Sequence, residues 1–300
     1  MKTLTISLSG LAICAAGASF AGTQDFVPVA PVSVAAPVSA PSWSAGVDLS
    51  YGLSARTNTD SDGPIENSPF GGFSIGGYFS TNIGQMDLTI DGRFTQYDFN
   101  GETDAYVTGP KGSGALGVHL GKNVGNTFIG GFAAYGIFEG YDGQEDYMGG
   151  YMVGAEASKA LGNGTGFAQL GYANLIGDPD DNEFVGVIGR VGYGFDISEK
   201  IGVVLDVEAG YSFDCFVDCD NQPGMYGIAG VEVEYRFSDT MAAFAGYEFI
   251  NIYDEDDGDT GTESNIMLGV RMAFGASDDG NLLATPMGAF KAAGWMEPLD

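Results

Sequence analysis

The sequence contains little positive charge and almost no histidine. Its 300 residues include 11 Lys+Arg, 40 Asp+Glu and one His, so the formal net charge is −29. Binding to nucleic acid depends on positive side chains that neutralise phosphates, and this charge balance argues against it. We expect no nucleic-acid partner, and we expect cations or cationic solutes to be attracted instead.

Long apolar runs and cofactor motifs are also missing. After residue 21, no stretch reaches the roughly 18 consecutive apolar residues of a transmembrane helix. The sequence has no Walker-type loop, no dinucleotide fingerprint and no metal-spaced His/Cys cluster, so it predicts no cofactor and no metal. Hydrophobic residues still make up 44% of the chain and glycine contributes 49 residues, which favours strands and tight turns.

The first 21 residues have the features of a cleaved signal peptide. Lys2 precedes an apolar core that is too short to span a bilayer, and the small residues Ser19–Ala21 follow it. A retained anchor helix is the alternative. Cys14 follows "LAI", which resembles a lipobox but lacks the small residue expected directly before the cysteine. Residues 22–42 are rich in Pro, Ala and Val and predict an extended spacer.

Removal of the signal leaves only two cysteines, Cys215 and Cys219, in "FDCFVDCDNQP". Export implies an oxidising compartment, so we expect a disulfide between them. Two free thiols remain an alternative. A metal site is less favoured because no histidine accompanies the pair.

One pattern recurs from residue 43 to residue 275. Runs of about ten residues alternate between apolar and polar or small side chains, as in strands with two different faces. The sequence contains twelve such runs, at 43–56, 71–80, 85–99, 114–122, 127–139, 147–160, 165–176, 183–196, 201–212, 225–237, 242–253 and 264–275. About nine to eleven residues cross a bilayer as a tilted strand, so each run has a suitable length.

The connections between the runs alternate too. Short turns such as 81–84 and 123–126 occur at one end, and longer, mostly acidic segments such as 253–263 occur at the other. This alternation is typical of an up-and-down meander that crosses a membrane. An even strand number places both ends of the barrel on the short-turn side, which for an exported chain is the periplasm.

The stretch "GVEVEYRF", residues 230–237, indicates which face meets lipid. Four apolar side chains alternate here with three charged ones: Val231, Val233, Tyr235 and Phe237 with Glu232, Glu234 and Arg236. Unpaired charges in a dry core cost several kcal/mol. Aromatic residues also gather near the run ends, as in the girdles at a membrane interface. We therefore predict an apolar face toward lipid and a polar face toward a wet lumen.

The chain resembles the porin-like bacterial outer-membrane β-barrel proteins. The most specific element is "IMLGVRMAF", Ile266–Phe274, which alternates and ends on an aromatic residue. It is similar to the terminal strand that the barrel-assembly machinery recognises in that family. The resemblance implies an all-β fold, a single antiparallel up-and-down transmembrane β-barrel of about 12 strands over 43–275, in a Gram-negative outer membrane.

The resemblance also implies a function. Porin-like barrels use Arg opposite Asp or Glu to orient solutes and to select ions. The candidate lumen residues on the predicted polar faces are Asp87, Asp91, Arg93, Glu156, Arg190, Asp206, Glu208, Glu232, Glu234, Arg236, Glu248 and Arg271. The excess of acids favours passive, cation-biased diffusion of small hydrophilic solutes. Salt bridges that prop or plug the lumen are the alternative reading of the same residues.

Other functions remain open beside the channel. A non-conducting structural or surface-interaction barrel would act through its acidic extracellular loops. These loops would bind divalent cations that bridge to lipopolysaccharide. A soluble exported β-protein and an outer-membrane enzyme are less favoured. His119 is the one histidine, but Gly121 stands where outer-membrane phospholipases carry a serine, and His119 lies toward the periplasmic end, unlike the site of omptin-type proteases. We expect no catalytic residue.

The end of the sequence departs from the family pattern. Residues 276–300 continue beyond the aromatic that ends the last run, whereas family members usually stop at that residue. We expect a periplasmic tail. An entry of this tail into the lumen, through Phe290, Trp295 and Met296, is the alternative.

Overall fold

The computed structural model describes most of the region that the sequence assigns to strands. It describes residues 43–60, 63–64, 69–98, 112–139, 147–176, 183–213, 224–254, 260–275 and 283–293. All of them belong to the second of two compact units, Ala40–Asp300. The predicted signal peptide, the spacer, and the predicted disulfide between Cys215 and Cys219 lie outside the described residues.

Strands make up nearly all of the described chain. They are β1 (Trp43–Asp60), β2 (Gly63–Pro64), β3 (Pro69–Ile83), β4 (Met86–Asp98), β5 (Gly112–Val124), β6 (Thr127–Glu139), β7 (Tyr147–Leu161), β8 (Gly164–Ile176), β9 (Glu183–Ser198), β10 (Ile201–Ser212), β11 (Gly224–Ser238), β12 (Met241–Asp254) and β13 (Thr260–Gly275). Helix α1, Gly288–Ala293, follows them. Across the residues described, no helix has the length and apolarity needed to cross a bilayer.

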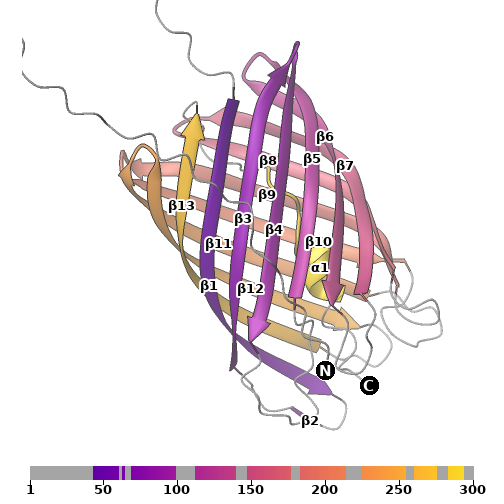
Figure 1. Ribbon diagram of the computed structural model, residues 1–300. Helices are drawn as coiled ribbons and strands as arrows, with labels where there is room; N and C mark the ends of the chain where they lie inside the picture. Colours follow the sequence, from indigo (N-terminus) through magenta and orange to yellow (C-terminus); the bar gives the residue numbers. More distant parts are fainter. Residues whose placement is uncertain are drawn as a thin grey trace, which may run out of the picture. The chain divides into compact units, whose positions relative to one another are not determined.

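The strands close into a barrel (Figure 1). Each long strand pairs antiparallel with the next one along the chain, and β13 returns to pair with β1. Leu49, for example, lies between Val270 of β13 and Ile75 of β3. The two-residue β2 only extends the end of β1. The predicted single antiparallel up-and-down barrel of about 12 strands is therefore confirmed.

Tight turns join the strands at one end of the barrel. Each of these connections has two residues, at 84–85, 125–126, 162–163, 199–200 and 239–240. Gly84 and Gly125 adopt φ angles of 66° and 67°, in the left-handed region that glycine enters without a steric penalty. We call this the short-turn end. The first and last barrel strands also begin and finish there, since Ser44 pairs with Gly275.

The outward face of the barrel is apolar. Leu116, Leu170 and Leu268 are 59%, 68% and 63% exposed. Within residues 230–237, from which the outward face was predicted, Tyr235 and Phe237 are 44% and 61% exposed. A soluble protein hides such side chains, whereas a barrel in lipid presents them. The predicted orientation of the two faces is therefore confirmed for the barrel itself.

The inward face differs from the uniformly wet lumen that the sequence predicts. The inward positions of β1 and of β3 to β5 carry small and polar side chains. Those of β6 to β9, β11 and β12 contribute an apolar cluster of buried side chains: Phe132, Met152, Leu175, Phe184, Ile188, Tyr226, Ile228, Ile250 and Ile252. Alternation places these residues on the inside, but their apolar side chains require apolar contacts there in place of water.

Many inward aromatic rings lie flat against the wall, over glycines of neighbouring strands. A methyl group added at Gly192 would lie 2.3 Å from the Phe167 ring, and one at Gly269 would lie 2.4 Å from the Phe244 ring. Glycine thus gives the ring space beside the backbone, as in the known pairing of aromatics with sheet glycines. The rings therefore pack against the wall of the barrel.

We predict that Gly192→Ala destabilises the barrel by about 1–3 kcal/mol, because the added methyl overpacks the wall. It would meet the Phe167 ring at 2.3 Å and the backbone oxygen of Leu205 at 2.7 Å. Urea unfolding in detergent micelles, followed by circular dichroism, measures the change. Gly227→Ala is the matched control, because nothing lies within 4 Å of its added methyl. Equal stabilities of the two variants would contradict this packing.

Candidate functional site

The described part of the C-terminal tail lies against the inward face of the barrel. The chain leaves β13 at the short-turn end, and α1 contacts β6 and β8 to β11 (Figure 1). The contacts of residues 283–293 agree with the alternative that the sequence leaves open for this tail, entry into the lumen. Trp295 and Met296 and the side chain of Phe290 lie outside what the structure describes. Thr285, Gly288 and Lys291 supply the contacts discussed below.

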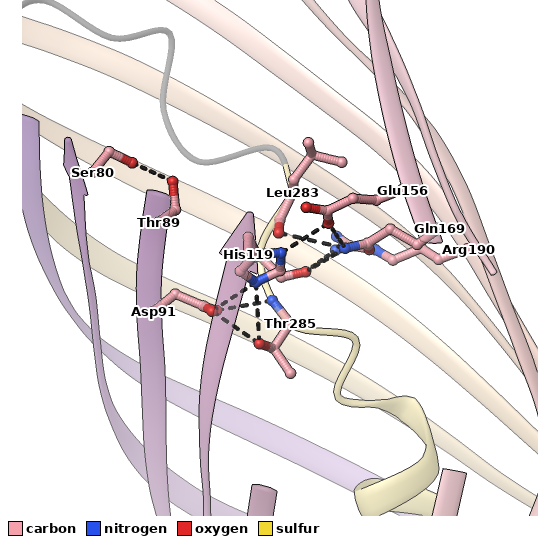
Figure 2. A network of polar contacts seen from close by, with 10 residues as sticks. Ser80, Thr89, Asp91, His119, Glu156, Gln169, Arg190, Leu283 and Thr285 are labelled. Atoms are coloured by element: carbon pink, nitrogen blue, oxygen red, sulfur yellow. Dashed lines mark hydrogen bonds and ion pairs between the residues drawn. The ribbon is translucent and has the colours of Figure 1, made fainter. Parts of the chain in front are cut away.

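A buried histidine organises the polar side chains around this segment (Figure 2). His119 is 2% exposed. Its Nδ1 lies 2.8 Å from Glu156 Oε2, and its Nε2 lies 2.9 Å from Asp91 Oδ1. The ring also stacks on Phe132. Two carboxylates match an imidazolium, which donates from both nitrogens, so β4, β5 and β7 are tied together at one point.

Asp91 holds the tail directly. Its Oδ2 accepts the backbone N–H of Thr285 at 2.8 Å, and its Oδ1 accepts the Thr285 hydroxyl at 2.9 Å. Gly117 makes room for this contact, because a methyl group there would lie 1.8 Å from Thr285 Oγ1. The hydrogen bond from His119 to Asp91 fixes the carboxylate in the position that Thr285 uses.

Neighbouring strands bind the backbone on either side of Thr285. Gln169 Nε2 donates to the carbonyls of Leu283 and Ala284, at 3.4 and 3.3 Å. Arg190 Nη1 donates to the Ala284 carbonyl at 3.2 Å, and its Nε pairs with Asp206 at 2.8 Å. The side chains of β8 and β9 thus supply donors to these partly buried carbonyls.

The start of α1 is bound by acids of β10 and β12. Glu208 Oε1 accepts the Gly288 N–H at 2.9 Å and also the hydroxyl of Tyr226 at 2.9 Å. A side chain at Gly288 would collide with this carboxylate, since its Cβ would lie 2.2 Å from Glu208 Oε1. Lys291 pairs with Glu248. The tail therefore meets complementary groups at several points between Leu283 and Lys291.

A second charged cluster lies nearer the short-turn end. Arg271 Nη1 lies 3.0 Å from Glu232 and 2.8 Å from Glu234, across a strand that separates them in the sheet. Arg236 pairs with Glu234 at 3.0 Å and with Asp196 at 2.9 Å. The side chains of Arg236 and Asp196 are 34% and 49% exposed, so this cluster is in contact with solvent.

All the candidate lumen residues predicted from the sequence lie on the inward face, by strand parity and by their contacts. Four of them bind the tail and one supports it: Asp91, Arg190, Glu208 and Glu248, with Glu156 behind His119. The others pair among themselves or with groups of the wall: Asp87, Arg93, Asp206, Glu232, Glu234, Arg236 and Arg271. Asp48, which pairs with Arg93 at 3.0 Å, joins this second group.

Sequence reasoning missed several members of the site. The sequence singles out His119 as the one histidine but does not indicate its two carboxylate partners. Gln169 and Asp196 also follow the inward parity of their strands, and that parity is the signal that could have found them. Thr285 and Gly288 lie in a tail without periodicity, so no comparable signal marks them.

The group around His119 resembles a catalytic triad in its residue types but lacks the geometry that catalysis requires. Thr285 Oγ1 lies 3.5 Å from His119 Nε2, and Glu156 binds the other ring nitrogen. A general base needs a free nitrogen toward the nucleophile, whereas Asp91 occupies Nε2 and also accepts the Thr285 hydroxyl. In the part of the chain that is described, no group of three or more His, Cys, Asp or Glu residues has an arrangement suited to a metal. The geometry is that of a docking site.

Comparison with known proteins gives relatives of fold only. No known protein family and no curated protein matches the sequence. The chain is similar in structure to the Pseudomonas putida toluene transporter TodX (TM-score 0.40, 10% identity, 76% of this chain and 89% of that one). It is also similar to KdgM porin (0.42, 7%, 75% and 99%) and to the translocator domain of autotransporter NalP from Neisseria meningitidis (0.43, 13%, 75% and 87%). These are bacterial outer-membrane β-barrel proteins, and the likeness concerns architecture alone.

We predict that His119→Ala destabilises the barrel by about 3–5 kcal/mol, because the buried carboxylates of Asp91 and Glu156 lose the ion-pair partner that they share. Urea unfolding in micelles measures the loss. Asp87→Asn is the control, since Asp87 is an inward carboxylate near the short-turn end that accepts from the neutral amides of Asn82 and Asn123. A loss no larger than that of the control would show that His119 does not hold the site together.

Proposed function

We propose that the chain is an outer-membrane, porin-like channel for passive, cation-biased diffusion of small hydrophilic solutes. The exposed apolar side chains around the barrel support its insertion in a bilayer. The sequence features of a signal peptide and the terminal strand Ile266–Phe274 support export and assembly in the outer membrane. In this placement the barrel-assembly machinery, membrane lipid and lipopolysaccharide are its partners.

The observation that carries the proposal is the charged cluster of Arg271, Arg236, Glu232, Glu234 and Asp196. It faces inward, lies close to one mouth and is partly exposed to solvent. Structural salt bridges in a closed core are normally buried, whereas rings of charge in contact with water act on passing ions. Three acids against two arginines leave this cluster negative, which supports a preference for cations.

The wall packing also supports conduction. Inward rings such as Phe167 and Phe244 lie over glycines and under arginines, with Arg190 and Arg271 at 5.1 and 4.8 Å from the ring centroids. These large side chains therefore occupy the wall. On β3, small hydroxyl side chains such as Ser74 and Ser80 face inward, which supports passage of hydrophilic solutes.

A non-conducting barrel that acts through acidic extracellular loops is the second candidate. The observation in its favour is the C-terminal segment, which takes up part of the lumen in contact with β6 and β8 to β11. The acidic loops themselves lie outside the described residues. The two candidates agree on the membrane and differ only in whether ions pass.

Planar-bilayer recording of the purified full-length protein tests the proposal. We expect discrete conductance steps and, in a salt gradient, a reversal potential of the sign that cation preference gives. Silence across repeated insertions, verified by detection of the protein in the bilayer, would exclude the channel and leave the structural barrel.

We predict that the double variant Glu232→Gln, Glu234→Gln weakens the cation preference, because it removes both carboxylates that face Arg271. The reversal potential should move toward zero or change sign, while the protein keeps the heat-modifiable mobility of a folded barrel. Glu199→Gln, in an exposed turn at the same end, is the control for loss of charge outside the lumen. An equal shift in the control would assign the selectivity to the general surface charge.

A further inference from the structure

The geometry points to a peptide-binding site on the inner wall of the barrel, occupied in this structure by the chain's own C-terminal segment. We propose that it recognises a peptide with a threonine and, three residues later, a glycine that begins a helical turn, as in Thr285–Gly288. The site consists of Asp91, Gly117, Gln169, Arg190 and Glu208, and Figure 2 shows the part around Thr285. The proposal concerns binding and does not depend on whether the lumen conducts.

The wall binds the peptide backbone through hydrogen-bonding groups of the correct polarity. Donors face the carbonyls, since Gln169 and Arg190 both donate to Ala284. Acceptors face the amides, since Asp91 and Glu208 accept the N–H groups of Thr285 and Gly288. Side chains that only filled space would not match the polarity of the backbone groups in this way, and binding of a peptide in trans requires the same match.

Two positions give the site its sequence preference. Asp91 accepts the Thr285 hydroxyl in a slot that exists because residue 117 has no side chain. At Gly288 a side chain would have to displace Glu208 and Tyr226, because its Cβ would lie 2.2 and 2.7 Å from them. A peptide without a hydroxyl at the first place loses a buried hydrogen bond, and one with a side chain at the second place collides with the wall.

The receptor groups are fixed by contacts that do not involve the tail. His119 orients Asp91, and Asp206 orients Arg190, at 2.9 and 2.8 Å. Glu156 accepts from Gln169 at 3.2 Å. Because these side chains are already held in place, binding costs little ordering of the wall, which is the condition for measurable affinity of a short peptide.

The covalent connection of the tail to β13 affects any measurement of peptide binding. A tail joined to β13 by only a few residues is present at an effective concentration in the millimolar range, so a free peptide competes poorly with it. The tail must therefore be displaced within the full-length protein. Thr285→Val with Gly288→Val removes the hydroxyl and introduces the collision with Glu208, without altering any strand of the barrel.

The test measures binding of a labelled peptide, residues 283–293, to the full-length tail variant in detergent micelles by fluorescence anisotropy. We expect saturable binding, at least tenfold weaker for a peptide that carries the same two substitutions, and little binding to the wild-type chain, whose site is filled. Thr285→Val alone serves as a second receptor background. Absence of saturable binding, or equal binding of both peptides, would overturn the proposal.

A change in the wall separates specific docking from adsorption to the micelle. Adding Gly117→Val to the tail variant fills the threonine slot and should abolish binding of the wild-type peptide. Adding Gly227→Ala, where the new methyl meets no atom within 4 Å, should leave it unchanged. Binding that survives Gly117→Val would place the peptide elsewhere and overturn the site. Because anisotropy does not report conduction, its failure and the failure of the channel are distinguishable.

Discussion

Closure of the sheet is the constraint on which the rest of the structure depends. Once β13 pairs with β1, every long strand has two neighbours, so no edge is left to expose unpaired N–H and C=O groups. In such a sheet each residue faces either in or out, and a slip of one residue would exchange the faces of a whole strand. The register that pairs Leu49 with Val270 and Ile75 therefore also decides that Asp48 and Arg271 face inward.

Charged side chains on the inward face need partners inside the barrel. The pairs in this barrel often skip one strand: His119 of β5 reaches Glu156 of β7, and Arg271 of β13 reaches Glu232 of β11. Such contacts are possible because a concave wall brings the inward side chains of next-nearest strands close together. They brace the barrel from within and, near the short-turn end, they also leave charge in contact with water.

The architecture and the faces could be predicted from the sequence, because both follow from a period of two and from the spacing of turns. Glu232, Glu234 and Arg236 needed only their parity to be placed inward. Their partners could not be predicted in the same way, since parity identifies a face and not which residue two strands away stands opposite. Thr285 and Gly288 were missed for a stronger reason. Their position depends on the shape and chemistry of the finished wall.

The apolar inward cluster explains why the tail takes this place. Met152, Leu175 and Ile250, each 1% exposed or less, face the inside of a barrel whose outside is also apolar. Open to water, they would cost about 25 cal/mol for each Å² of apolar area. Met287 and Ala289 pack on the same cluster, while Asp91, Gln169 and Glu208 satisfy the backbone that carries them. The tail is thus held by both halves of the inner wall, and its release would expose apolar surface as well as break hydrogen bonds. A ligand that replaces the tail must therefore offer apolar side chains beside its threonine and glycine.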